Sequence, residues 1–136
     1  MRPGREFALF AIGGVIGLVV SAGSIQLMVS LLDMNPYLAW LFAFLLAATA
    51  TWWWNRRHTF AARSSGRSLL GEWAHWIVLM GFGALVNYGV FILCLMLFPS
   101  WHRWPSLAVA AGSVVAAGVN FLSARLMLFR RSKTVV

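Results

Sequence analysis

Four long stretches of the sequence contain no charged side chain, and this feature does most to limit the folds available to the chain. They cover residues 7–32, 37–54, 73–98 and about 106–122. Each can cross the roughly 30 Å hydrocarbon core of a bilayer as a helix that rises about 1.5 Å per residue. Their hydrophobicity is continuous rather than alternating, which favours helices over the strands of a barrel. The sequence therefore predicts an all-α integral membrane protein with four transmembrane helices.

The composition indicates that lipid is the solvent of this chain. Only 10% of the residues are charged, whereas roughly a quarter of the residues in a soluble domain are charged. The four helices and their connections occupy nearly all of residues 1–136, so we expect a single membrane domain. The one cysteine, Cys94, lies inside an apolar stretch, and no cluster of cysteine and histidine suggests a metal. We predict neither a metal nor a cofactor.

The basic residues are distributed unevenly over the connections. Two precede the first stretch, four lie between the second and third, and four follow the last, so that only Arg103 of the eleven lies on the opposite side. The positive-inside rule then places both termini and the central loop in the cytoplasm. Topology and contact with anionic headgroups explain the net charge of +8. No nucleic-acid partner is expected, because the basic residues form no amphipathic stripe or known motif.

The chain repeats itself at an offset of 69 residues without gaps. Identical residues recur at equivalent topological places, among them Pro36 and Pro105, Arg56 and Arg125, and Phe60 and Phe129. The repeat halves cover about 5–66 and 72–134. Because each half has two spans, both halves point the same way, as a parallel repeat related by an axis near the membrane normal. The interface between the two helix hairpins is the natural place for a site.

The two halves end in a similar pattern, in which a polar residue, an aromatic residue and a small or polar residue precede an arginine. The pattern begins at Thr51 and at Asn120, and it ends at Arg56 and Arg125. At helical spacing Thr51 and Asn55 share a face. The arginines lie near headgroup depth, where a planar guanidinium offers several donors to phosphate oxygens. The alternative is that these arginines only stop translocation and set the topology.

Polar side chains inside the spans are costly in lipid unless they are paired, so they should face the bundle. These residues are Gln26, Asn87 and Asn120. Asn87 and Thr51 are candidates for a polar path that accommodates a sugar. The alternative is that the amides form hydrogen bonds between helices, and for Gln26 this alternative is favoured.

Glycines are dense in the first and third spans. Gly13 and Gly17 form a GxxxG pair with Gly14 beside it, and Gly83 aligns with Gly14 in the repeat. Such residues let helix backbones approach closely, within one chain or between chains. We therefore expect close helix packing at these positions. Four helices make a thin bundle, so we also expect a dimer or larger homo-oligomer, which would shield a polar slot better.

The three acidic residues all lie at the ends of spans. Glu6 and Glu72 stand at the starts of the first and third spans, where they complement the helix dipole and the neighbouring arginines. Asp33 lies in the turn after the first span. No arrangement of nucleophile, base and orienting group is visible, and neither is a glycine-rich phosphate loop. We therefore do not expect an enzyme.

These motifs, taken with the spans and the repeat, resemble those of the GtrA-like family of small four-helix membrane proteins. The resemblance covers residues 7–129 and rests on three short motifs in order. They are Phe-x-x-Phe-x-x-Gly-Gly at 7–14, then Asn55-Arg56 with Thr59-Phe60, and last Asn120-Phe121 with Arg125 and Phe129. His58 and Met127 depart from the pattern, because an aromatic residue often precedes the terminal pair. Ala124 stands where the first half has Asn55, so we expect less hydrogen bonding from the second half.

The resemblance implies the flipping of a polyprenyl-phosphate-linked monosaccharide, such as undecaprenyl-phosphate glucose, across the bacterial cytoplasmic membrane. The lipid-linked sugar would serve the synthesis or modification of cell-envelope polysaccharide, and a partner glycosyltransferase would make it. The resemblance also implies that the headgroup end of the site contains Asn55, Arg56, Asn120 and Arg125.

Two other classes of function stay open. One is a non-transporting membrane subunit that anchors or organises a glycosyltransferase, which would tolerate the loss of Asn87 or Asn120. The other is a small multidrug-type exporter. That class generally needs an acid inside the membrane to pair with cations, whereas here the acids lie at the ends and basic residues dominate. This balance suits an anionic ligand, so the exporter ranks third.

Overall fold

The computed structural model describes residues 3–59 and 66–117, and every regular element within these ranges is helical. Helix α1 spans Pro3–Leu32, and α2 spans Pro36–Trp54 before it continues into a π-helical turn, η1, over Asn55–Thr59. Helix α3 spans Leu69–Leu97, and a short 3-10 turn, η2, covers Pro99–His102. A fourth helix follows at Pro105–Ala117.

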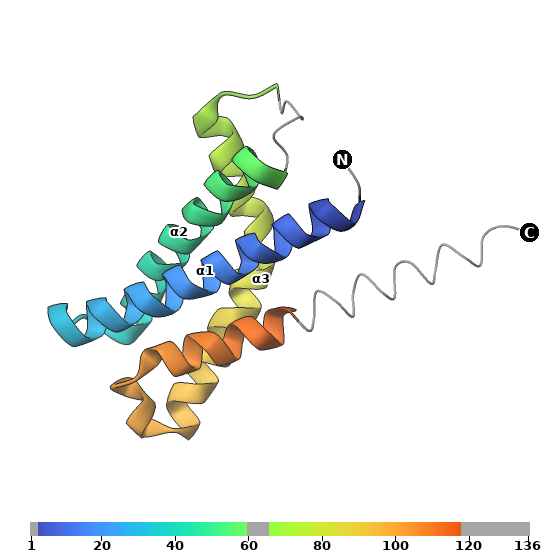
Figure 1. Cartoon of the computed structure of the whole chain (residues 1–136). Helices are drawn as coiled ribbons and strands as arrows, with labels where there is room; N and C mark the ends of the chain where they lie inside the picture. The colour runs from blue at the N-terminus through green and yellow to red at the C-terminus, as the bar shows by residue number, and fades with distance from the viewer. Residues whose placement is uncertain (1–2, 60–65, 118–136) are drawn as a thin grey trace, which may run out of the picture.

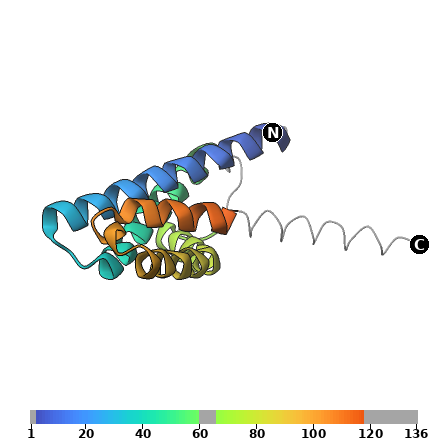
Figure 2. The same cartoon turned by 90° about the horizontal axis from the view of Figure 1, so that it is seen from below.

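The described helices form two hairpins, which are joined by a long connection between α2 and α3. Residues 33–35 link α1 to α2, and residues 98–104 link α3 to the fourth helix. The end of the bundle formed by these two links is called the turn end, and the end formed by η1 and the start of α3 is called the basic end. Figures 1 and 2 show α1 and the fourth helix running in opposite directions beside one another.

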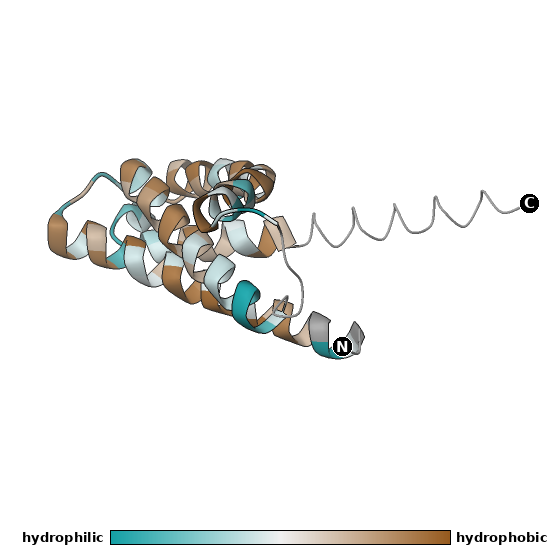
Figure 3. Ribbon diagram, turned by 90° about the horizontal axis from the view of Figure 1, so that it is seen from above, coloured by the Kyte–Doolittle hydropathy of each residue, from teal (hydrophilic) through white to brown (hydrophobic). Residues whose placement is uncertain are grey.

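The helices have the length and the surface of membrane spans. Within the described residues, three segments are long and apolar enough to cross a bilayer: Ala8–Leu32, Pro36–Thr59 and Leu69–Leu97. The fourth helix is apolar but shorter, and residues 118–122 of the expected fourth span lie outside the described residues. Large hydrophobic side chains point outward along the spans, among them Val15, Val19, Val78, Phe82 and Leu85. In Figure 3, hydrophobic residues (brown) recur along each of the helices.

The first hairpin turns within three residues because Asp33 ends α1 and the next helix is capped at once. Asp33 adopts the left-handed conformation, with a φ of 51°, and this breaks the helical path of α1. Asn35 then caps α2, because its side-chain oxygen accepts a hydrogen bond from the backbone N–H of Tyr37 at 2.9 Å. Pro36 occupies the first turn, where a missing N–H costs nothing.

The second hairpin has no asparagine at the equivalent place, because Trp104 stands there. An acceptor comes instead from α1. Oε1 of Gln26 accepts a hydrogen bond from the backbone N–H of Ser106 at 3.4 Å, and Nε2 donates to the carbonyl oxygen of Arg103 at 3.1 Å. Gln26 thus forms hydrogen bonds between elements, and the first hairpin helps to cap the second.

The apolar core lies toward the turn end and contains residues from all four helices. Its buried members are Ile25, Ala39, Trp40, Ala43, Phe91, Leu95, Ala108 and Val109. Because the small residues of α2 and the fourth helix leave room for the larger ones of α3, the helices pack closely there. The contacts at the basic end include many polar ones, which are described below.

The two described ends of the connection from residue 55 to residue 72 are helical. We expected a loop that can hold an interfacial turn; η1 prolongs α2 over Asn55–Thr59, and α3 begins at Leu69. Thr59 donates a hydrogen bond to Oδ1 of Asn55 at 2.7 Å, and both side chains are buried, so these polar groups satisfy each other inside the turn. Ser68 caps α3 by accepting a hydrogen bond from the N–H of Gly71 at 3.1 Å.

Candidate functional site

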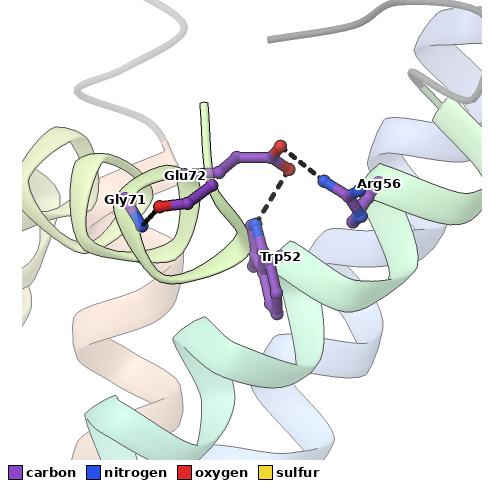
Figure 4. Close-up of polar contacts among 5 residues, drawn as sticks. Trp52, Arg56, Gly71 and Glu72 are labelled. Carbon is purple, nitrogen blue, oxygen red and sulfur yellow. Dashed lines mark hydrogen bonds and ion pairs between the residues drawn. The ribbon is translucent and has the colours of Figure 1, made fainter. Parts of the chain in front are cut away.

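An ion pair joins the end of α2 to the start of α3 at the basic end. Oε2 of Glu72 pairs with Nη1 of Arg56, and Oε1 of Glu72 accepts a hydrogen bond from the indole nitrogen of Trp52 at 3.2 Å. Figure 4 shows the carboxylate lying between these two side chains. The side chain of Arg56 is 39% exposed and that of Glu72 is 20% exposed. A partly exposed pair gains little net stability, so an external anion can compete for the guanidinium.

Asn55 points in a different direction from its neighbour Arg56. Asn55 is 3% exposed, and its side chain packs against α1. A β-carbon placed on Gly13 would lie 3.2 Å from Nδ2 of Asn55 and 3.1 Å from Cδ1 of Trp54. Asn55 therefore lies within the packing between α1 and the end of α2, whereas Arg56 reaches α3.

The same close approach continues one turn further along α1. A β-carbon on Gly17 would lie 2.8 Å from Cγ2 of Thr51, which is closer than real side chains come. The hydroxyl of Thr51 donates to the carbonyl oxygen of Ala48 at 3.0 Å. Gly14 is exposed, and a β-carbon there would meet no described atom within 4 Å. Gly83 is half-buried on α3. Gly13 and Gly17 thus lie at the contact between α1 and α2, and Gly14 lies outside it.

Aromatic rings surround the remaining basic side chains of η1. The guanidinium carbon of Arg57 lies 4.5 Å from the ring centroid of Trp53. The ring of His58 stacks on Trp54, with 3.9 Å between the ring centroids. Rings and cations together are typical of the headgroup level of a membrane protein.

Asn87 connects three helices inside the bundle. Its Oδ1 accepts a hydrogen bond from the indole nitrogen of Trp40 on α2 at 3.0 Å, and its Nδ2 donates to Oγ of Ser113 on the fourth helix at 3.0 Å. A β-carbon on Gly112 would lie 2.7 Å from the backbone oxygen of Asn87, so the fourth helix approaches α3 closely at this point. The amide of Asn87 therefore forms hydrogen bonds between helices. This is the second of the two roles considered for it, the first being to line a polar path.

An open apolar groove of about 490 Å³ lies between α2 and α3. Helix α2 contributes Trp40, Leu41 and Phe44, and α3 contributes six residues between Val78 and Tyr88. Aromatic rings form part of its wall, since Trp40 stacks on Phe44 with 5.6 Å between the ring centroids. The hydrogen bond from Trp40 to Asn87 fixes this wall in place. The sequence did not indicate the groove, because it depends on how two separate helices diverge.

Two of the predicted site residues, Asn120 and Arg125, lie outside the described residues. Of the others, the described structure brings Thr51 and Asn55 together with Gly13 and Gly17 of α1, whereas Asn87 lies apart from them with Trp40. Glu72 was expected to complement the helix dipole and the arginines, and its pairing with Arg56 agrees with that expectation. Among the described residues no three His, Cys, Asp or Glu side chains are grouped so as to hold a metal.

These features define a multi-pass α-helical membrane domain, with a charged end and an open apolar groove. The sequence model of the GtrA/DPMS transmembrane-domain family matches residues 9–130, which is most of the chain. The chain therefore belongs to this family, and membership connects it with membrane processes that involve lipid-linked sugars. No curated protein and no solved structure matches it.

Proposed function

We propose that this protein translocates a polyprenyl-phosphate-linked monosaccharide across the bacterial cytoplasmic membrane, for the synthesis or modification of cell-envelope polysaccharide. One observation carries the proposal. A single pair of helices, α2 and α3, holds an exposed guanidinium at its end and an open apolar groove along its length. A polyprenyl phosphate has the same two parts, an anionic head and a long apolar chain. Membership of the GtrA/DPMS transmembrane-domain family supports the same class of ligand.

The phosphate is assigned to Arg56, together with Arg125 of the second half. Arg56 lies at the end of α2, and its side chain is 39% exposed, so it is accessible from the membrane boundary. Guanidinium donors match phosphate oxygens in geometry and charge. Trp52 donates to the same carboxylate that pairs with Arg56, and Trp53 lies under Arg57. Both rings suit the interface between headgroups and hydrocarbon.

The polyprenyl chain is assigned to the groove between α2 and α3. Along α3 the groove begins at Val78, six residues beyond Glu72, which corresponds to about 9 Å of helix. A lipid whose phosphate binds Arg56 would therefore have about 9 Å of helix to cover before its chain reaches the groove. A second copy of the protein would cover the open side of the groove, which supports the expectation of a homo-oligomer.

We further propose that the basic end faces the cytoplasm, where a partner glycosyltransferase makes the lipid-linked sugar. The bias of Lys and Arg over the connections supports this orientation. No acid is present inside the spans, since the three acidic residues all lie at span ends. Coupling to protons therefore has no evident carrier, and movement down a concentration gradient is the simpler mechanism.

Lipid retention in native mass spectrometry tests the proposal. The protein is purified in mild detergent and mixed with undecaprenyl phosphate, as wild type, as Arg56→Ala with Arg125→Ala, and as Arg57→Ala. The wild type should retain the lipid and the double variant should lose it. Arg57→Ala is the matched control, because it removes one positive charge from the same turn while its guanidinium lies over Trp53.

The same variants are then compared for transport in vesicles loaded with a fluorescent undecaprenyl-phosphate sugar. Exchange between leaflets by the wild type, and its loss in the double variant, would support translocation. Retention without exchange would favour the non-transporting subunit that anchors a glycosyltransferase. Equal retention by all three proteins would remove these arginines from the mechanism.

A further inference from the structure

We propose that Glu72 is an internal competitor of the lipid phosphate, which occupies Arg56 when no lipid is bound and sets how tightly the lipid is held. This inference rests on the proposed function of Arg56 as a phosphate ligand. It adds a residue that would determine how tightly the lipid binds and how fast it is released. Glu72 follows α2 on a different helix, α3, and would act by competing with the phosphate for Arg56 rather than by binding the lipid.

The geometry of the carboxylate supports this role. Its two oxygens bond different partners on the preceding helix, Oε2 with Nη1 of Arg56 and Oε1 with the indole nitrogen of Trp52. The side chain of Glu72 is more enclosed than that of Arg56, at 20% against 39% exposure. The carboxylate is therefore held in position, and the guanidinium is the more accessible partner from outside. Figure 4 shows this arrangement.

The position of Glu72 in the sequence of elements also supports it. Glu72 lies in the first turn of α3, after the Ser68 cap, so the helix start fixes the carboxylate relative to the end of α2. A negative charge is stabilised there by the helix dipole even when it is released from Arg56. When Arg56 moves from the carboxylate to a phosphate, the arginine therefore stabilises the phosphate, and the start of α3 still stabilises the carboxylate.

The charges determine the direction of the effect. A carboxylate and a lipid phosphate are both anions, and each needs the same guanidinium at close range. With Glu72 ionised, the phosphate must displace the carboxylate and also experiences its repulsion. Binding is weakened as a result, and release of the lipid is made faster. A transporter needs such a balance, because a phosphate held too tightly at one side of the membrane does not leave.

Substitution of Glu72 by glutamine tests the proposal, because the amide keeps an oxygen acceptor and a similar shape but loses the charge. The protein variants Glu72→Gln, Arg56→Ala and Glu72→Gln with Arg56→Ala are compared with wild type for binding of undecaprenyl phosphate in detergent. Asp33→Asn is the matched control, since it removes the same charge at the turn end, and asparagine tolerates the left-handed conformation of that residue. Undecaprenol serves as a probe that lacks the phosphate head, and inorganic phosphate serves as a probe that lacks the polyprenyl chain.

We expect Glu72→Gln to bind undecaprenyl phosphate roughly tenfold more tightly than wild type, which corresponds to about 1.4 kcal/mol at 25 °C. Asp33→Asn should bind as wild type does, and the gain should disappear when Arg56 is also replaced. Undecaprenol should show no gain. Inorganic phosphate should displace undecaprenyl phosphate at a lower concentration from Glu72→Gln than from wild type. This result would support competition between the carboxylate and a phosphate for Arg56.

The inference and the proposed function can fail separately. If wild type and Glu72→Gln both fail to bind undecaprenyl phosphate, the proposed function is wrong and the competition has no ligand. If wild type binds the lipid and Arg56→Ala does not, the proposed function stands. The inference is then overturned if Glu72→Gln binds the lipid no more tightly than wild type does. Weaker binding by a folded Glu72→Gln protein would mean that the carboxylate orients the arginine rather than competing for it. Thermal melting of each variant verifies that it is folded.

Discussion

Asn87 on α3 accepts a hydrogen bond from the indole of Trp40 on α2, and the two heavy atoms lie 3.0 Å apart. The other side of the same amide donates to Ser113 on the fourth helix, also at 3.0 Å. One side chain therefore joins both hairpins at a point where all partners are surrounded by apolar residues. Hydrogen bonds of this kind hold transmembrane helices together, because lipid offers no competing partner.

Replacement of Asn87 by leucine should lower the stability of the protein. The change leaves the indole N–H of Trp40 without its partner, and an unsatisfied buried group costs about 1–3 kcal/mol. The hydroxyl of Ser113 keeps its hydrogen bond to the carbonyl oxygen of Val109 at 2.9 Å. Thermal unfolding in detergent, followed by size-exclusion chromatography, measures the effect. In a double-mutant cycle with Trp40→Phe, we expect a coupling of about 0.5–1.5 kcal/mol.

A second tryptophan provides the control for this experiment. The indole nitrogen of Trp76 is buried, and it has no hydrogen-bond partner in the described part of the chain. Trp76→Phe should therefore lower the melting temperature less than Trp40→Phe, although both remove the same group. Equal losses from the two substitutions would show that the bond to Asn87 contributes nothing measurable.

The spans could be predicted from the sequence, but the partners of their polar residues could not. Continuous hydrophobicity over residues 7–32 and 73–98 is sufficient to predict α1 and most of α3, because lipid demands helices with satisfied backbones. The bond between Asn87 and Trp40 joins residues 47 apart in the chain. No local rule pairs them, since it is the rotation of each helix about its axis that brings the amide to the indole.

Gly17 of α1 allows the closest approach between α1 and α2, and its replacement by leucine should separate the two helices. A β-carbon there would already lie 2.8 Å from Cγ2 of Thr51. Overpacking of this kind costs about 1–3 kcal/mol, so the melting temperature should fall. Gly23→Leu on the same helix is the matched control, because Gly23 is exposed and a β-carbon there meets nothing within 4 Å. A similar loss for both variants would point to the glycine backbone rather than to the contact.

The polar end of α2 explains why the site was only partly predictable. The sequence pattern identified Asn55 and Arg56 together, yet one side chain packs against α1 and the other pairs with α3. Adjacent residues on a helix point in different directions, so a shared motif does not imply a shared site. Opposite charges at Arg56 and Glu72 suggested attraction, but four arginines lie between the second and third spans. The pairing of Arg56 with Glu72 depends on the path of η1, which the polar sequence of that turn did not reveal.

The two hairpins differ in how their second helix is capped, and this difference can be measured. Asn35 caps α2 from its own hairpin, whereas Gln26 of α1 reaches Ser106 at the start of the fourth helix. Asn35→Ala and Gln26→Leu should each cost about 1 kcal/mol, as the loss of a helix cap does. Thermal unfolding compares the two. If Gln26→Leu has no effect while Asn35→Ala does, the contact between hairpins does not contribute to capping.

The apolar groove can be filled without disturbing the fold, because Gly81 lies in its wall with open space around it. Gly81→Leu should leave the melting temperature close to that of wild type, yet it should weaken the binding of undecaprenyl phosphate and slow its exchange between leaflets. The reason is that the leucine side chain takes the volume assigned to the polyprenyl chain. Gly89→Leu is the matched control, since Gly89 lies on the same helix, is exposed, and a β-carbon there would meet no described atom within 4 Å. Short farnesyl phosphate, which reaches less far from Arg56, should be affected less than undecaprenyl phosphate. Equal binding of the long lipid by both glycine variants and wild type would place the chain outside the groove while leaving the phosphate site at Arg56 untouched.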